Sequence, residues 1–300
     1  MIVGPRRVRW WGRGAAAAAL AVALAGCSFA TTEHAGTPSA LPTGLTIAPA
    51  AASTSAPAND GPASSAPPPA SALPSASAPP SALLGRVTVV EIGDSLGEDL
   101  GFGLQDVLAG NASVRLVQAA KGNSGLVQPQ YYDWPRHLRE LLAQYQPAAV
   151  IVFLGANDVQ DFYQDGALLR FGTPAWEVAY RERVANIMQE ATDAGSKVLW
   201  VGMPVMRSAT FSSSMQRLND IYEEEAASHE GVTFFSSWQV MSSPSGGYEA
   251  TATGPDGRSI VLRTPDGIHI AFGTGGRGAE VLGQGVVNAL MPLLSGDAAG

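Results

Sequence analysis

Short apolar runs rich in β-branched residues alternate along the chain with longer segments in which apolar residues recur every three or four positions. The short runs are typical of buried strands, and the longer segments are typical of amphipathic helices. Such alternation favours right-handed crossovers, so we expect a doubly wound α/β domain with a mostly parallel sheet. The expected strands are 87–92, 114–117, 148–154, 197–201 and 232–235, and the expected helices are 100–108, 134–145, 176–194, 215–229 and 279–294.

One segment departs from this alternation. Residues 248–263 alternate polar and apolar positions around the sequence Gly254-Pro255-Asp256-Gly257, which is typical of a turn. We therefore predict a β-hairpin outside the main sheet. No internal repeat is visible in the sequence.

The first thirty residues have the pattern of an export signal. Four arginines up to Arg13 precede an apolar run from Ala15 to Leu24, which is too short to span a bilayer comfortably. The segment Leu24-Ala25-Gly26-Cys27 resembles the lipobox of bacterial lipoproteins, which implies cleavage after residue 26 and lipidation of Cys27. An ordinary signal peptide with an incidental cysteine is the alternative. The pair Arg6-Arg7 is only a weak indication of twin-arginine export, because apolar residues do not follow it.

Residues 27–85 have the composition of a linker. Eleven of the 21 prolines lie between Pro38 and Pro80, and Asp60 is the only charged residue between His34 and Arg86. Such a segment cannot bury enough apolar surface to offset its chain entropy, so we predict disorder. We therefore divide the chain into a signal peptide (1–26), a linker (27–85) and one globular domain (86–296).

Charge and cysteine content exclude several functions. Without the four arginines that precede Cys27, the formal charge of −8 becomes −12. A domain this acidic repels the phosphate backbone, so we expect no nucleic-acid partner. A single cysteine excludes an intrachain disulfide and a cysteine-based zinc site.

Polar, glycine-containing segments follow three of the predicted strands. They are Gly93-Asp94-Ser95-Leu96, Lys121-Gly122-Asn123-Ser124-Gly125 and Gly155-Ala156-Asn157-Asp158. A fourth segment, Asp266-Gly267-Ile268-His269, precedes the last helix. Ligands in such sheets collect beyond the carboxyl ends of the strands, so these segments form the candidate site. A lone Gly-Asp-Ser is more often a turn with a helix cap.

The histidines support a catalytic interpretation. Of the four, His34 lies in the linker, while His137 and His229 lie in predicted helices among charged neighbours. Only His269 has a carboxylate three residues earlier, at Asp266. This spacing lets Asp266 accept a proton from one ring nitrogen while the other ring nitrogen faces a nucleophile.

Taken together, the four segments resemble, in order and spacing, the sequence blocks of the SGNH/GDSL hydrolase superfamily. The resemblance extends from about residue 87 to residue 294 and implies a flavodoxin-like three-layer α/β/α sandwich. It implies that Ser95 is the nucleophile, His269 the general base and Asp266 its orienting carboxylate. The oxyanion hole would consist of the N–H groups of Ser95 and Gly125, with Gly122 as the alternative glycine, and the amide of Asn157. The family needs no cofactor and no metal.

Four further residues have open roles. Asp94 and Asp158 are expected to brace their loops, and a metal site that includes them with Asp266 and His269 is disfavoured by the resemblance. Arg207 could contact substrate or form a structural salt bridge. Trp134, with Tyr131 and Tyr132, could line a sugar-binding cleft or pack in the core.

Export and ester chemistry together predict an esterase that removes O-acyl groups, chiefly acetyl, from an envelope or extracellular glycan. The alternatives are an O-acyltransferase on the same class of glycan and a non-catalytic glycan-binding lipoprotein. The expected substrate is an acylated carbohydrate or another small ester. Contact with the membrane is expected only through the lipid anchor. Lipase activity is disfavoured because the linker holds the domain away from the lipid.

Overall fold

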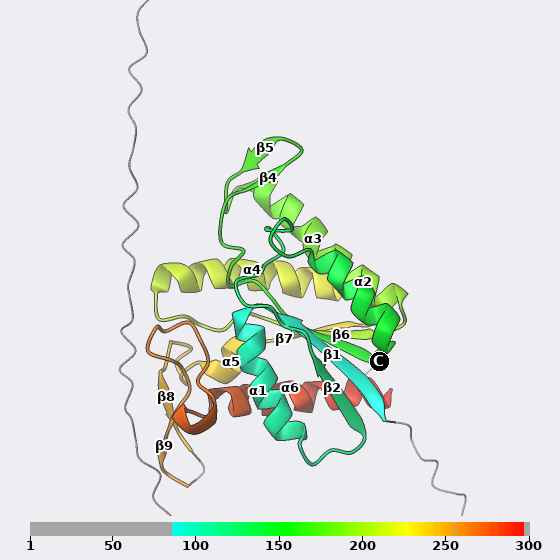
Figure 1. Ribbon diagram of the computed structural model, residues 1–300. Helices are drawn as coiled ribbons and strands as arrows, with labels where there is room; N and C mark the ends of the chain where they lie inside the picture. The colour runs from blue at the N-terminus through cyan, green and yellow to red at the C-terminus, as the bar shows by residue number, and fades with distance from the viewer. Residues whose placement is uncertain (1–85, 255, 297–300) are drawn as a thin grey trace, which may run out of the picture. The chain divides into compact units, whose positions relative to one another are not determined.

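The computed structural model describes residues 86–254 and 256–296. A five-stranded sheet, with all neighbouring strands parallel, lies at its centre in the order β2-β1-β3-β6-β7 (Figure 1). This order and the flanking helices confirm the predicted flavodoxin-like α/β fold. The predicted signal peptide, Cys27 and the linker lie outside the described residues.

The elements agree closely with those expected from the sequence. The central strands are β1 (Val87–Gly93), β2 (Val114–Gln118), β3 (Ala149–Phe153), β6 (Lys197–Val201) and β7 (Val232–Phe235), and the helices are α1 (Ser95–Leu108), α2 (Trp134–Tyr145), α3 (Pro174–Asp193), α4 (Ala209–Ser228), α5 (Ser237–Met241) and α6 (Gly278–Ser295), with a 3₁₀ turn η1 (Gly273–Gly275). The predicted hairpin is present as β8 (Thr251–Thr253) and β9 (Ser259–Val261).

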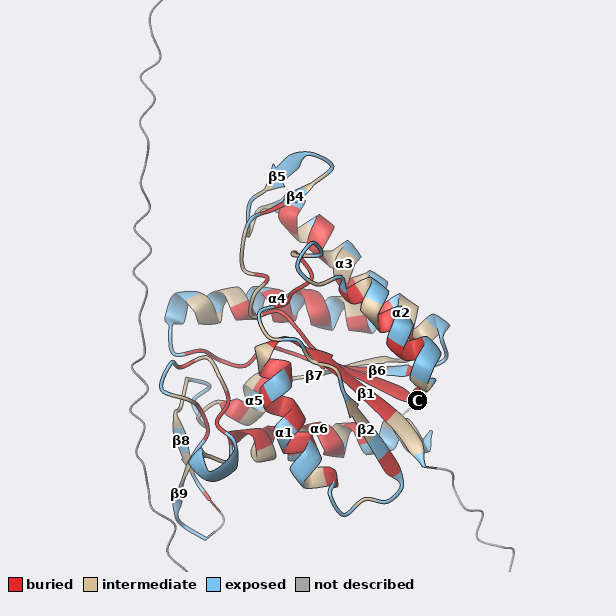
Figure 2. Cartoon of the chain, in the orientation of Figure 1, coloured by how far each residue is buried: buried red, intermediate tan, exposed pale blue. Residues whose placement is uncertain are grey.

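The middle of the sheet is buried on both faces. Every residue of β3 is buried, and its neighbours β1 and β6 are buried over most of their length (Figure 2). Helices α1, α5 and α6 cover one face, and α2, α3 and α4 cover the other. This double cover explains why β3 is wholly apolar in sequence.

Helices α1 and α6 approach each other unusually closely. A Cβ atom on Gly103 of α1 would lie 1.8 Å from the carbonyl oxygen of Ala279, and one on Gly283 of α6 would lie 2.7 Å from the Gly103 backbone. The two glycines let the helix backbones touch. This contact fixes α1, which begins at Ser95, against the last helix.

Several features of the fold differ from those expected. Residues 162–169 form a second hairpin, β4 (Phe162–Gln164) and β5 (Ala167–Leu169), whose turn Asp165-Gly166 has φ values of +52° and +79°. Such a pair is typical of a type I′ turn. Helix α4 begins six residues before the expected start because Ser208 caps it by accepting from the Phe211 N–H. The short helix α5 and the η1 turn were also not expected.

Candidate active site

The four predicted segments meet at the carboxyl edge of the sheet. β1 and β3 are neighbours, and the chain leaves β1 toward one face and β3 toward the other, which makes this edge the topological switch point. Gly93 pairs with Phe153 at the ends of the two strands, so the segments after them begin side by side. The fold therefore places the nucleophile segment and the Asn157 segment together.

Ser95 is the first residue of α1. The preceding residue, Asp94, caps the helix by accepting from the Leu96 N–H at 2.9 Å. The helix N-terminus carries partial positive charge, which stabilises negative charge that develops beside Ser95. Helix α1 therefore begins five residues before the expected start at residue 100.

Ser95, His269 and Asp266 form a continuous hydrogen-bonded chain. The Oγ of Ser95 lies 2.9 Å from Nε2 of His269, and Nδ1 of His269 lies 2.7 Å from Oδ2 of Asp266. Because a carboxylate only accepts, Nδ1 carries the proton and Nε2 is free to accept the serine proton. The arrangement is the one a serine hydrolase needs, assembled from residues 174 positions apart in sequence.

Asp266 is held in its ionised form. Its Oδ1 accepts from the hydroxyl of Thr264 and from the backbone N–H groups of Ile268 and His269. Partial burial opposes ionisation, but the hydrogen bonds from His269, Ile268 and Thr264 outweigh it and hold the pKa of Asp266 well below its usual range. The carboxylate can therefore orient the imidazole and stabilise the imidazolium at neutral pH.

Asp94 links the nucleophile segment to the Asn157 segment. Its Oδ2 accepts from the N–H groups of Gly155 (3.1 Å) and Ala156 (3.0 Å), while Oδ1 caps α1. The side chain is completely buried, and this burial raises its pKa to about 7 against the opposing effect of the three N–H donors. These contacts are those of a brace between two loops.

Asp158 connects the Asn157 segment to the glycine segment. It is fully buried, accepts from the Val127 N–H at 3.0 Å and receives the hydroxyl of Tyr180 at 2.8 Å. Burial raises its pKa despite these donors. A Cβ on Gly125 would lie 2.2 Å from Asp158 Oδ1, so the approach of this carboxylate requires glycine at position 125.

The two candidate glycines differ in what their N–H groups bind. The Gly122 N–H donates to Glu98 Oε1 at 2.8 Å, whereas the Gly125 N–H has no acceptor among the residues that the structure describes. Asn157 lies beside this segment, since its Nδ2 donates to the Ser124 carbonyl at 2.9 Å. The geometry therefore favours Gly125 over Gly122 as an oxyanion donor.

Trp134 has no exposed surface with which to line a cleft. The side chain is completely buried, and its indole N–H donates to Ser124 Oγ at 3.0 Å. The alternative of a sugar-binding role is wrong for this residue, because the first turn of α2 packs into the core beneath the glycine segment. Trp134 instead supports that segment, while Tyr131 is half exposed at the surface.

Arg207 lies against the histidine segment without a carboxylate partner among the described residues. Its guanidinium donates to the Pro265 carbonyl at 2.6 Å and to the Tyr248 hydroxyl at 3.3 Å, and its backbone N–H donates to the Gly267 carbonyl. The described residues therefore give the salt-bridge alternative no support, and substrate contact by Arg207 stays a prediction. The residue binds the turn between Asp266 and His269.

Two buried residues that hold the histidine segment were missed from the sequence. Asp99 accepts from the Ile270 N–H at 2.9 Å, and its burial raises its pKa to about 6. Arg263 is 2% exposed and donates to the carbonyls of Val205, Ile268 and His269. Their partners are distant in sequence or are backbone atoms, so no motif marks them.

One side of α1 contacts the histidine segment along two turns. Ser95 meets His269, Asp99 meets Ile270, and the exposed ring of Phe102 stacks on Phe272 with centroids 4.3 Å apart. Positions 95, 99 and 102 lie on one face of a helix. The helix that carries the nucleophile therefore also positions the base.

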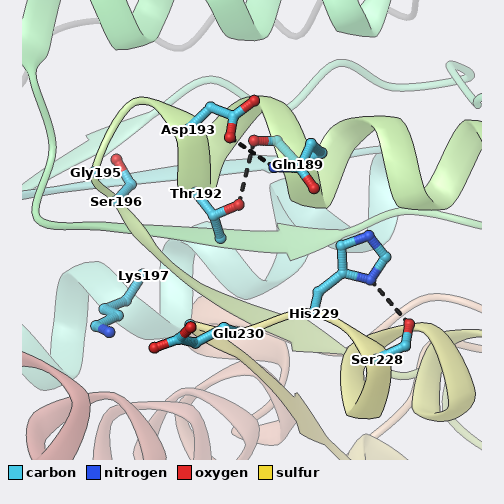
Figure 3. Close-up of a pocket in the computed structure, with 10 residues that line it drawn as sticks. Gln189, Thr192, Asp193, Gly195, Ser196, Lys197, Ser228, His229 and Glu230 are labelled. Carbon is cyan, nitrogen blue, oxygen red and sulfur yellow. Dashed lines mark hydrogen bonds between the residues drawn. The ribbon is translucent and has the colours of Figure 1, made fainter.

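A separate hollow lies at the opposite, amino edge of the sheet. It has a volume of about 490 Å³ and lies beside Lys197, His229 and Glu230 (Figure 3). The His229 ring is 2.8 Å from the Glu225 carbonyl of its own helix, and none of the predicted site residues lines the hollow. It has no part in the serine chemistry.

The chain matches one known family model over most of its length. Residues 88–289 match the family model described as "Protein of unknown function (DUF459)". The chain belongs to this family. The four segments that carry the resemblance to SGNH/GDSL hydrolases converge at one edge of the sheet, as that resemblance implies. No curated protein matches the sequence.

Several solved structures resemble the chain. A GDSL-like lipase from Bacteroides thetaiotaomicron is 16% identical, with 68% of this chain and 88% of that chain covered and a TM-score of 0.47. The psychrotrophic esterase EstA from Pseudoalteromonas sp. is 15% identical (69% and 98% covered, TM-score 0.46). The periplasmic domain of a lipopolysaccharide acetyltransferase from Salmonella ser. Paratyphi A is 16% identical (69% and 84% covered, TM-score 0.47).

Residues 86–254 and 256–296 contain neither a metal-binding cluster nor a membrane-spanning helix. No group of three or more His, Cys, Asp or Glu side chains in this part of the chain could hold a metal ion. No helix in the same residues combines the length and the apolar character needed to cross a bilayer.

Proposed function

We propose that this protein is a serine esterase that removes O-acyl groups, chiefly O-acetyl groups, from a glycan of the cell envelope or the extracellular space. The proposal depends on one observation, the continuous chain of hydrogen bonds from Ser95 through His269 to Asp266. A serine hydroxyl is inert at neutral pH, and an adjacent oriented base is what activates it.

The reaction has two steps. In the first, Ser95 Oγ attacks the ester carbonyl, Nε2 of His269 takes the hydroxyl proton, and the same proton passes to the leaving sugar oxygen as its bond to the acyl carbon breaks. In the second, water attacks the acyl-enzyme, gives its proton to His269, and Ser95 leaves with that proton as the acid is released. General-base catalysis of this kind contributes about 10²–10⁴-fold.

Negative charge on the attacked carbonyl oxygen needs fixed donors. The N–H groups of Ser95 and Gly125 and the side-chain amide of Asn157 are the proposed set. Asp94 and Asp158 tie the three segments that carry these donors to one another. Donors held in this way need little reorganisation when the oxyanion forms, and each contributes about 3–4 kcal/mol.

Exposure of the site favours hydrolysis over acyl transfer. The side chains of His269 and Asp266 are 36% and 46% exposed, so water reaches the base directly. A transferase must keep water away from its acyl-enzyme until the acceptor binds. The O-acyltransferase alternative uses the same residues, and it is tested by adding a glycan acceptor to an acyl donor and measuring acylated glycan.

The glycan substrate and the location are supported by the sequence. The predicted signal peptide, lipidated Cys27 and linker would place the domain outside the cytoplasm and away from the lipid surface. O-acyl esters on carbohydrate are ester substrates available to an enzyme tethered there. The anchor would be the only contact with the membrane, and no cofactor is needed.

The direct test is turnover of p-nitrophenyl acetate by the purified protein. Ser95→Ala and His269→Ala are expected to reduce kcat by at least ~10³-fold, since each removes a member of the catalytic chain. Ser113→Ala, an exposed serine on the same domain, is the matched control and should retain wild-type turnover. Equal rates for wild type and Ser95→Ala would refute the esterase and leave the non-catalytic glycan-binding alternative.

A further inference from the structure

A groove runs along α4 at the carboxyl edge of the sheet. Two hollows of about 450 and 540 Å³ meet at Gln216 and Trp238. The first is bounded by Arg207 and Tyr248, and the second extends toward Gln239. We call these two adjoining hollows together the α4 groove. Each half has the volume of a small-molecule site, and the two together suit an extended ligand.

The groove begins beside the catalytic loop. Arg207, at one end of it, donates to the carbonyls of Pro265 (2.6 Å) and Gly267 (3.0 Å), which flank Asp266. A Cβ on Gly267 would lie 2.5 Å from the Cβ of Arg207, so the contact is direct. A chain lying in the groove would therefore pass close behind the Asp266–His269 pair.

The lining combines flat aromatic rings with hydrogen-bonding groups that are neutral except for Arg207 and Glu223. Trp238 and Tyr248 provide the rings. The Trp238 indole N–H donates to the Gly246 carbonyl at 3.3 Å, and the Tyr248 ring packs against the guanidinium groups of Arg207 and Arg263. On the exposed side of α4, Gln216 donates to Asp220 and Ser213 donates to the Ala209 carbonyl, each at 3.0 Å, so their oxygens remain as acceptors for a ligand. Rings of this kind stack on the C–H faces of sugars, while amides and hydroxyls bind sugar hydroxyl groups.

Other classes of ligand fit this lining less well. A fully apolar acyl chain suits the half farther from Arg207 poorly, because Gln216, Asn219, Glu223, Ser236 and Gln239 line it. Nucleic acid is repelled by the net charge of −12 that remains after Cys27. A carbohydrate chain uses both the rings and the neutral polar groups.

We infer that the α4 groove binds the carbohydrate chain of the acylated substrate at a distance from the ester group being cleaved. This inference rests on the proposed esterase function. The groove determines which glycan is bound, and the Ser95 site determines which bond is broken. A small ester that does not reach the groove is hydrolysed independently of it.

The test compares glycan binding with small-ester turnover. The probes are hexasaccharides with neutral and with uronate backbones, without acyl groups, titrated calorimetrically into Ser95→Ala protein. In the Ser95→Ala background, the second substitution Trp238→Ala is expected to raise the Kd of the best probe about tenfold. Trp238→Phe in the same background keeps a flat ring and should retain most of the affinity. Gln216→Ala, an exposed change on α4, should weaken binding several-fold without affecting folding. Tyr163→Ala, which removes an exposed aromatic ring outside the groove, is the control.

The same substitutions with Ser95 present should leave turnover of p-nitrophenyl acetate unchanged. The inference is overturned if no hexasaccharide binds, or if Trp238→Ala and Gln216→Ala both bind it as tightly as the parent. Loss of p-nitrophenyl acetate turnover in Ser95→Ala, together with no effect of the groove variants on hexasaccharide binding, would retain the esterase and reject the groove. Absence of Ser95-dependent turnover would reject the esterase itself.

Discussion

Glu91 is a buried carboxyl that forms no side-chain hydrogen bond with the described residues. It lies in β1, three residues before Asp94, is completely buried, and neither of its side-chain oxygens has a hydrogen-bond partner among the described residues. Its carboxyl faces the first turn of α1, where a Cβ on Gly97 would lie 2.9 Å from Oε1. Burial, reinforced by the charges of Asp94 and Glu98, raises the pKa of Glu91 well above its usual value.

Two substitutions separate the effect of the unpaired polar atoms of Glu91 on stability from the effect of its charge. Glu91→Met removes the unpaired polar atoms and fills a similar volume, so it should stabilise the fold by about 1–3 kcal/mol. For a domain of this size that corresponds to an increase in Tm of roughly 2–12 °C. Glu91→Gln keeps a polar group of the same shape but cannot ionise, so it isolates the cost of charge.

The direction of the pH effect follows from linkage. Because the pKa of Glu91 is higher in the folded protein than in the unfolded chain, the unfolded chain releases its proton first as pH rises. The stability due to neutral Glu91 is therefore fully present below the unfolded pKa of about 4.3 and is lost as pH rises through the folded value. Asp94 and Asp99, whose pKa values are also raised, contribute a background slope.

Thermal unfolding at pH 5 and pH 9 measures the effect. The Tm of Glu91→Gln relative to wild type should be higher at pH 9 than at pH 5, and this difference cancels the background from the other acids. Glu182→Gln, at an exposed position, is the control and should match wild type at both pH values. A difference in Tm that is the same at both pH values, or destabilisation by Glu91→Met, would refute the reasoning.

Three further predictions concern the site and the anchor. Asn157→Ala should lower kcat toward p-nitrophenyl acetate by about 10²–10³-fold with little change in KM, and an effect on KM alone would remove Asn157 from the oxyanion role. Gly125→Ala should lower the free energy of unfolding by about 1–3 kcal/mol, because its Cβ would lie 2.2 Å from Asp158 Oδ1; an unchanged denaturation midpoint would contradict this. Cys27→Ala should move the exported protein from the membrane fraction to the soluble fraction, as measured by immunoblotting, and persistence in the membrane fraction would argue against a lipid anchor.

The sheet and the chain of hydrogen bonds from Ser95 to Asp266 could be predicted because each is built from short segments with recognisable sequence patterns. The wholly apolar run of β3 indicates a strand covered on both faces, and this is where it lies. Only one of the four histidines has a carboxylate three residues earlier, and that spacing alone brings Nδ1 of His269 to Asp266. The predicted helix over residues 134–145 matches α2 at both ends.

The supporting contacts could not be predicted in the same way. In the sequence, Asp99 cannot be distinguished from other acidic residues in helices. Its partner, the N–H of Ile270, lies 171 residues away and meets it only in the folded structure. Arg263 binds backbone carbonyls, which every residue has, so its sequence neighbours carry no signal. Trp134 was ambiguous because an aromatic residue at a helix start serves core or surface equally well, and only packing decides between them.

Ser95, Asp99 and Phe102 contact the histidine segment only because they lie on the same face of α1. The alignment of Ser95 with His269 therefore depends on the spacing of these residues along the helix. One extra residue inserted between Ser95 and Asp99 would rotate everything after it by about 100° about the helix axis. Asp99 and Phe102 would then face away from Ile270 and Phe272, although every member of the catalytic chain would still be in the sequence. Enzymes built this way can lose their activity through a change of spacing alone, and alignments that check only the motif residues would overlook it.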